Sequence, residues 1–188
     1  IPSMQGFFVH VTDGDFPVKG VLEMDNSVRI TDQTHPFTKS EDKGSSQVLR
    51  ISATFIDDNR GLKDFTAIYF NEKAVGKFDN RLDALKLMNT DLFAPNLYGF
   101  SSDGYKLSVH AMPLISDSLT IIPLGLRTER SGLISFRITS MENLSDISQV
   151  FLRDEAAGNE YLLSQDKSYN VPLTTGEYKN RFSLRLIR

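Results

Sequence analysis

The chain has 188 residues, of which 40% are hydrophobic and 24% are charged. This composition is that of a globular protein long enough to bury a core, and not of a disordered tail. Lys and Arg number 21 against 24 Asp and Glu, a net charge of -3, and no basic stripe is visible, so nucleic acid is excluded as a partner. Cysteine is absent, which removes disulfides, zinc–thiolate sites and cysteine nucleophiles.

Two features of the chain bear on its location. No apolar run approaches the ~20 residues that a membrane span needs, so we expect no membrane insertion. The sequence opens with Ile1-Pro2-Ser3 and has neither an initiator Met nor the regions of a signal peptide there. We therefore expect a fragment or a mature product of a larger protein.

Strand patterns recur along the whole chain as short alternating segments bounded by turn residues, which is typical of sandwiches and barrels. The clearest is 47–56, where apolar and polar residues alternate with a period of two. A second, 105–112, follows the turn pair Asp103-Gly104 and predicts a hairpin. Further strands are predicted at 6–11, 21–24, 65–70, 119–126, 133–139, 150–153, 161–164 and 181–187.

Residues 79–88 interrupt the strand patterns and favour a short helix. Asp79 or Asn80 would cap it, and three apolar residues would share one side, Leu82, Leu85 and Met88.

The fold class predicted from these patterns is all-β, an antiparallel β-sandwich with one short helix. We expect a jelly-roll-like sandwich over 1–113 and a smaller immunoglobulin-like or fibronectin-like sandwich over 114–188, because about seven strand-sized segments follow the seam near 113–118. The alternative is one continuous sandwich over 1–188.

Catalytic motifs occur only as partial matches. The serine–lysine pattern S-x-x-K occurs at Ser40 with Lys43 and at Ser164 with Lys167, both times in turn-like polar sequence. The three histidines, at 10, 35 and 110, have no metal-binding spacing; His110 lies in a strand pattern, where a solvent-facing or hydrogen-bonded histidine is expected. We therefore predict that the chain is not an enzyme and has no cofactor, calcium excepted.

A calcium site is the one metal site that the sequence suggests. Oxygen ligands are concentrated in one short stretch, at Asp57, Asp58, Asn59 and Asp64. The stretch lacks the bidentate acid that ends a true calcium loop, and Asp-Asn-Gly runs between strands are commonly turn chemistry. Both interpretations stay open.

Tyrosines are the candidates for ligand contact, because Trp is absent. Tyr69 and Tyr98 are the residues expected to touch a glycan, if one binds. Tyr178, before the last predicted strand, is expected to be structural, with its hydroxyl tying a corner to nearby backbone as in sandwich domains.

An ordered set of short motifs runs from Ile1-Pro2-Ser3-Met4-Gln5-Gly6-Phe7-Phe8-Val9 through Phe78-Asp79, Asp83-Ala84-Leu85-Lys86 and Ile122-Pro123-Leu124-Gly125. It continues through Val150-Phe151-Leu152-Arg153-Asp154 and Tyr169-Asn170-Val171 to Arg181-Phe182-Ser183-Leu184. This set resembles the β-sandwich region of large secreted and surface proteins of the Bacteroidetes, typically upstream of a type IX secretion sorting domain. The resemblance implies an extracellular or cell-surface location, and it transfers no catalytic residue.

Three functions are consistent with these observations. The first is a non-catalytic structural or adhesive module, whose partners are other domains of the same parent protein, surface proteins or glycans. The second is a carbohydrate-binding module, an analogy at the level of the fold. The third is a hydrolase with an unrecognised site.

Overall fold

The computed structural model describes residues 9, 11, 19–25 and 47–188. The chain divides into two compact units, Ile1–Lys43 and Gly44–Arg188. The described residues of the first unit are exposed and belong to no strand or helix, so the strand predicted at 21–24 is wrong. The strand predicted at 6–11 lies outside the described residues, apart from Val9 and Val11.

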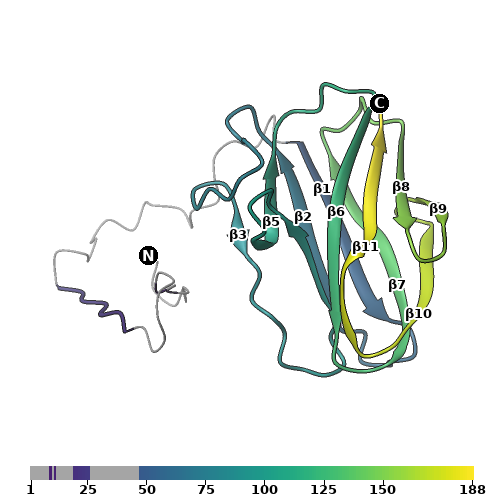
Figure 1. The fold of residues 1–188 in the computed structure, drawn as a ribbon, viewed down its shortest axis with the longest axis horizontal. Coiled ribbons are helices and arrows are strands. Elements are labelled where there is room, and N and C mark those ends of the chain that lie inside the picture. The colour runs from purple at the N-terminus through teal and green to yellow at the C-terminus, as the bar shows by residue number, and fades with distance from the viewer. Residues whose placement is uncertain (1–8, 10, 12–18, 26–46) are drawn as a thin grey trace, which may run out of the picture. The chain divides into compact units, whose positions relative to one another are not determined.

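The second unit is built from strands joined by turns, and its described residues form no helix (Figure 1). The all-β class is thereby confirmed. None of the described residues forms a helix long and apolar enough to cross a membrane. The first six strands are β1 (Gln47–Phe55), β2 (Lys63–Phe70), β3 (Ala84–Leu85), β4 (Asn96–Phe100), β5 (Lys106–Met112) and β6 (Leu119–Thr128). The other five are β7 (Gly132–Glu142), β8 (Gln149–Asp154), β9 (Asn159–Leu163), β10 (Ser168–Leu173) and β11 (Gly176–Ile187).

Ten of these strands form one continuous sheet in the order β10-β7-β1-β2-β5-β4-β6-β11-β8-β9, and β3 pairs with β5 beside this path. All neighbours are antiparallel except β2 and β5, which are parallel, so the predicted antiparallel sheet has one exception. The two ends of the order, β9 and β10, contact each other. The sheet therefore curls into a near-closed, barrel-like form.

Strands from both predicted domains pair within this sheet. β1 pairs with β7, with Ile51 opposite Ile138, and β4 pairs with β6, with Leu97 opposite Leu126. The division predicted at residue 113 falls between two strands of the same sheet, β5 and β6. The two-sandwich arrangement is therefore not confirmed.

The core is enclosed by the curved sheet and follows the alternation visible in the sequence. Four residues of β1 are at most 1% exposed and line the inner face, as predicted: Leu49, Ile51, Ala53 and Phe55. The second half of the chain contributes to the same cluster, where the Phe136 and Phe182 rings lie 4.9 Å apart. Each fully buried side chain of this size stabilises the fold by about 1.5–3 kcal/mol.

The helix predicted at 79–88 is wrong. One helical turn forms, with the Asp83 amide donating to the Asp79 carbonyl at 2.7 Å. The Asp83 carboxylate then accepts the backbone N–H groups of Asp79 at 2.8 Å and of Ala111 at 2.6 Å. These bonds anchor the chain to β5, where Ala84–Leu85 pairs as β3. Pairing with β5 is favoured because an isolated helix of this length is marginal in water.

Candidate functional site

The sheet is left open along a seam between β7 and β9. β10 pairs with β7 only between Gly132 and Arg137, whereas β1 pairs with β7 as far as Glu142. Residues 138–142 therefore have a strand partner on one edge only, among the residues that the structure describes. β9 likewise pairs only with β8. Two unpaired strand edges thus border the same opening.

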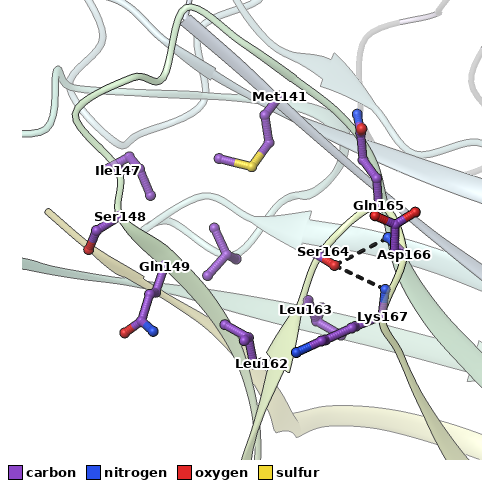
Figure 2. A pocket seen from close by; sticks show the side chains of 11 residues that line it. Met141, Ile147, Ser148, Gln149, Leu162, Leu163, Ser164, Gln165, Asp166 and Lys167 are labelled. Carbon is purple, nitrogen blue, oxygen red and sulfur yellow. Dashed lines mark hydrogen bonds between the residues drawn. The ribbon is translucent and has the colours of Figure 1, made fainter.

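A groove of ≈ 540 Å³ occupies this seam (Figure 2). Its floor is formed by three buried apolar side chains, Ile147, Val150 and Leu163. Two more exposed ones stand at its rim, Met141 and Leu162, which are 37% and 36% exposed. The volume lies within the range of small-molecule sites.

The turn between β9 and β10 forms the polar wall of the groove. The Ser164 hydroxyl accepts hydrogen bonds from the amides of Asp166 at 3.2 Å and Lys167 at 3.0 Å. Ser164 therefore stabilises the turn, consistent with its position in turn-like polar sequence. The Lys167 amino group lies toward Leu162 and Leu163 in Figure 2, with no hydrogen bond or ion pair to any described residue.

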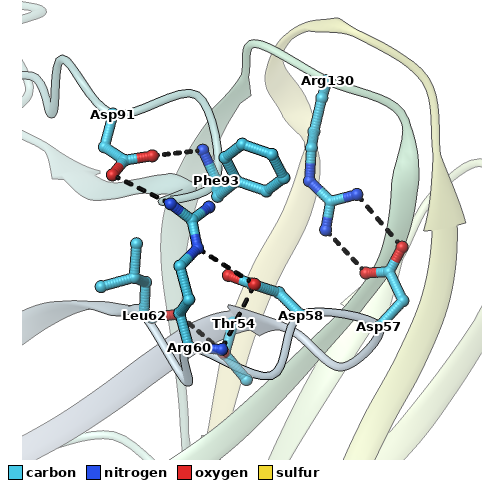
Figure 3. A network of polar contacts seen from close by, with 8 residues as sticks. All are labelled: Thr54, Asp57, Asp58, Arg60, Leu62, Asp91, Phe93 and Arg130. Carbon is cyan, nitrogen blue, oxygen red and sulfur yellow. Dashed lines mark hydrogen bonds and ion pairs between the residues drawn. The ribbon is translucent and has the colours of Figure 1, made fainter.

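Two of the predicted calcium ligands, Asp57 and Asp58, lie elsewhere, in the turn between β1 and β2 (Figure 3). Asp57 is bound by the Arg130 guanidinium through two hydrogen bonds of 3.1 and 2.8 Å. These bonds lower the pKa of the Asp57 carboxyl. Arg130 also lies over the Phe55 ring, 4.0 Å from its centroid. The carboxylate thus joins the β1–β2 turn to the turn between β6 and β7.

Asp58 takes part in a second ion pair of the same network. Its Oδ1 accepts from Arg60 Nε at 3.2 Å, and Arg60 also lies 3.5 Å from the Asp91 carboxylate. The Arg60 guanidinium stacks 3.7 Å from the centroid of Phe93 (Figure 3). These contacts hold the β1–β2 turn against the loop that precedes β4.

The remaining predicted ligands are not brought to this network. Asn59 is exposed in the turn. Asp64 lies on β2, where its Oδ2 accepts the Leu97 amide at 2.6 Å and forms an ion pair with Lys86, whose side chain is 4% exposed. Within the described part of the chain, no three His, Cys, Asp or Glu side chains are grouped to hold a metal ion. Each of the three predicted carboxylates has a cation as its partner.

The two candidate glycan-contacting tyrosines do not form a common surface. Tyr98 is completely buried, and its ring packs on Gly125, where any Cβ would lie 2.1 Å from the ring. Its hydroxyl donates to Glu177 at 2.7 Å. Tyr69 is half-buried, and its hydroxyl accepts from Asn71 at 2.7 Å. Tyr98 is therefore not accessible to a ligand.

Glu177 is the centre of a small charged cluster. It accepts hydrogen bonds from Lys106 and Tyr98, and Lys179 lies 3.4 Å away. The Lys106 and Tyr98 bonds lower the pKa of Glu177 to about 2. Burial and the hydrogen bond to Glu177 raise the pKa of Tyr98. The cluster holds β4, β5 and β11 together.

The structural role predicted for Tyr178 is confirmed. Its hydroxyl accepts from the Thr174 amide at 3.1 Å and donates to the Thr174 carbonyl at 2.8 Å, closing the connection between β10 and β11. His110, in contrast, is only 3% exposed, and its Nδ1 has no hydrogen-bond partner. The solvent-facing or hydrogen-bonded histidine expected there is therefore wrong.

Sequence reasoning missed the most completely buried carboxylate among the described residues, Asp154. Its two oxygens accept from Arg181 at 2.9 Å each, and one also accepts from the Tyr169 hydroxyl at 3.0 Å. Asp154 also accepts the amides of Ala156 and Ala157 in the turn after β8. The turn after β8 can be recognised from local sequence. Arg181 follows Asp154 by 27 residues, and no local pattern identifies it as the partner of the carboxylate.

The described unit is thus an all-β protein built on one strongly curved sheet with an open seam. The chain belongs to a family of domains of unknown function, DUF8693, whose model matches residues 1–186. Comparison with the curated proteins and with the solved structures found no match.

Proposed function

We propose that the chain is a non-catalytic structural or adhesive module of a secreted or cell-surface protein. The observation that carries this proposal is the position of the first and last strands of the described unit. β1 lies between β7 and β2, and β11 lies between β6 and β8. Each is held by two ladders of backbone hydrogen bonds, so a pull on either end of the unit acts on interior strands of the sheet. Such a unit is suited to hold neighbouring domains at a fixed separation.

The use of charged side chains supports the same proposal. Three ion pairs join segments that are distant in the sequence: Asp57 with Arg130, Asp64 with Lys86, and Asp154 with Arg181. In each of them the carboxylate that could act as a general acid or base is already bound to a cation. The Asp57 side chain is 47% exposed, whereas the Asp64 and Asp154 side chains are mostly buried. Removing one partner of a buried pair typically costs about 3–5 kcal/mol, a cost that concerns the pairs of Asp64 and Asp154 only. The charges therefore serve the rigidity of the module.

The location outside the cell is part of the proposal and is supported by the ordered motifs that resemble surface proteins of the Bacteroidetes. The description of the module as a β-sandwich is also part of the proposal. A near-closed curved sheet supports it, because such a sheet encloses its core between facing strands as a sandwich does. The carbohydrate-binding alternative now depends on Tyr69, because Tyr98 is buried.

Single-molecule force spectroscopy tests the structural proposal. The 188-residue chain would be placed between marker domains of known unfolding force and pulled from its two ends. We expect the described unit to unfold in one step, at a force above that of an α-helical marker domain. Asp154→Asn should lower this force, and Glu155→Gln, which alters an exposed neighbouring carboxylate, should not. Extension without any force peak would contradict the proposal.

A further inference from the structure

We propose that the seam between β7 and β9 binds an extended peptide that carries an apolar side chain and a carboxylate, and that this peptide adds to the sheet as a further strand. The inference deepens the adhesive part of the proposed function and rests on it, because it names the class of partner that the module would hold.

The unpaired strand edges provide the backbone part of this site. Among the described residues, 138–142 of β7 are paired with β1 only, and β9 is paired with β8 only. Unpaired edges expose backbone N–H and C=O groups that another extended chain can satisfy. A strand docked along residues 138–142 would continue the ladder where β10 leaves β7, and one docked along β9 would extend the β8–β9 ladder. Recognition of this kind needs an extended peptide, not a folded protein face.

The groove provides the apolar part of the site. Side chains of a strand alternate between its two faces, so every second residue of a docked peptide would point into the groove. There it would meet Ile147, Val150 and Leu163 on the floor, and it would cover Met141 and Leu162 on the rim. Burial of a leucine-sized side chain there removes apolar surface from water, which favours binding.

Charge complementarity provides the third part. The Lys167 ammonium lies on the groove side of its turn, and no described residue neutralises it (Figure 2). The neighbouring Asp166 carboxylate lies on the Gln165 side of the turn in the same view. Arg137 holds this turn in place by donating to the Gln165 carbonyl, so the cation is presented by a preformed loop. A peptide carboxylate on the same face as the apolar side chain would meet Lys167.

The test is a titration of the isotope-labelled 188-residue chain, followed through its backbone amide NMR signals. The probe is the capped peptide acetyl-Asp-Thr-Leu-Thr-Leu-amide, which presents one carboxylate and two leucines on one strand face. Two matched peptides have Lys in place of Asp, or Ser in place of both Leu. We expect the first peptide to shift the amide signals of residues 138–142 and of β9, and each matched peptide to bind at least tenfold more weakly.

Three variants test which residues of the groove determine binding and charge preference. Lys167→Glu should weaken the Asp peptide at least tenfold and strengthen the Lys peptide, a reversal that misfolding would not produce. Leu162→Asp should weaken both. Lys73→Glu, an exposed lysine away from the groove, should change neither. Shifts confined to another part of the surface, no shifts at all, or an unchanged preference in Lys167→Glu would each overturn the inference. Force unfolding of the free chain is independent of this site, so the two proposals can fail separately.

Discussion

At the scale of single residues, the environment of Asp154 predicts a large and specific contribution to stability. The carboxylate is fully buried and accepts two hydrogen bonds from Arg181 and one from Tyr169. Asp154→Asn leaves the Arg181 charge without its partner, so we expect the free energy of unfolding to fall by about 3 kcal/mol. Urea unfolding at pH 7 measures this. Glu155→Gln is the matched control, and an equal loss in both variants would contradict the argument.

Asp154 also predicts that the free energy of unfolding decreases at acid pH. Burial raises the pKa of Asp154, but the hydrogen bonds from Arg181 and Tyr169 outweigh it and leave the pKa below its usual value. The pKa of Asp154 is lower in the folded chain than in the unfolded chain. The contribution of Asp154 to stability is therefore fully present above the unfolded pKa of about 4, and it is lost as pH falls through the pKa of the folded chain. Unfolding free energies measured from pH 5 to pH 2 should therefore decline more steeply in the wild type than in Asp154→Asn.

His110 predicts a second pH effect, in a higher range. Burial lowers the pKa of its imidazole, against a smaller opposing effect of the Asp83 charge. The unfolded chain therefore takes up the proton first, near its ordinary pKa of about 6.5, and the fold loses stability as pH falls below that value. We expect His110→Gln to lose less stability than the wild type between pH 7.5 and pH 5.5 in urea titrations. Equal losses would show that His110 is not the titrating group.

Calcium can be tested at Asp57. Since Arg130 already binds both carboxylate oxygens, we expect saturating calcium to leave the melting temperature of the wild type unchanged. Asp57→Ala should lower the melting temperature equally with calcium and with a chelator. A calcium-dependent rise in the wild type that Asp57→Ala abolishes would restore the calcium site predicted from the sequence.

At the scale of elements, the Tyr178 corner fixes how the chain passes from β10 into β11. The phenol makes two hydrogen bonds to the backbone of Thr174. Tyr178→Phe removes both and leaves the ring packed, so we expect a loss of about 1–2 kcal/mol in unfolding free energy. Tyr105 is an exposed tyrosine whose hydroxyl bonds to no described residue, so Tyr105→Phe should change the unfolding free energy by less than about 0.5 kcal/mol.

Sequence patterns predicted the strands whose two faces differ. The predicted apolar face of β1 is buried, and the hairpin at Asp103-Gly104 is confirmed, with Gly104 at φ 91° in the left-handed region where glycine is favoured. β5 forms where predicted, but its alternation is broken because His110 is buried next to Ala111. β4 was missed because four of its five residues are buried, which removes the alternation. β10 was missed because Pro172 argues against a strand; an edge strand, however, tolerates proline.

At the scale of the whole molecule, strands from both halves of the chain share one sheet and one core. We therefore expect the described unit to unfold in a single cooperative transition. Urea unfolding followed by amide NMR signals should give the same midpoint for residues of β2 and of β8. Two separated midpoints would support the two domains that the sequence suggested.

The candidate groove could not have been predicted from the sequence. It is formed by the end of β7, the residues that lead into β8, the end of β9 and the turn between β9 and β10, and none of these segments carries a recognisable motif. The groove exists because β10 leaves β7 early, and this depends on strand order and register. Local sequence patterns predict neither strand order nor register. The Asp154–Arg181 pair was hidden for the same reason.

The pairing of β1 with β7 also sets the order in which the molecule can fold. Arg50 and Glu142, which contact each other across these strands, are 92 residues apart in the sequence. During synthesis, β1 can pair with β7 only after residues 132–142 have been made, and the sheet joins β6 to β8 only when β11 is available. Non-local pairings of this kind slow folding and expose strand edges meanwhile. A version of this unit that lacks β11 would therefore leave the partner edges of both β6 and β8 unpaired.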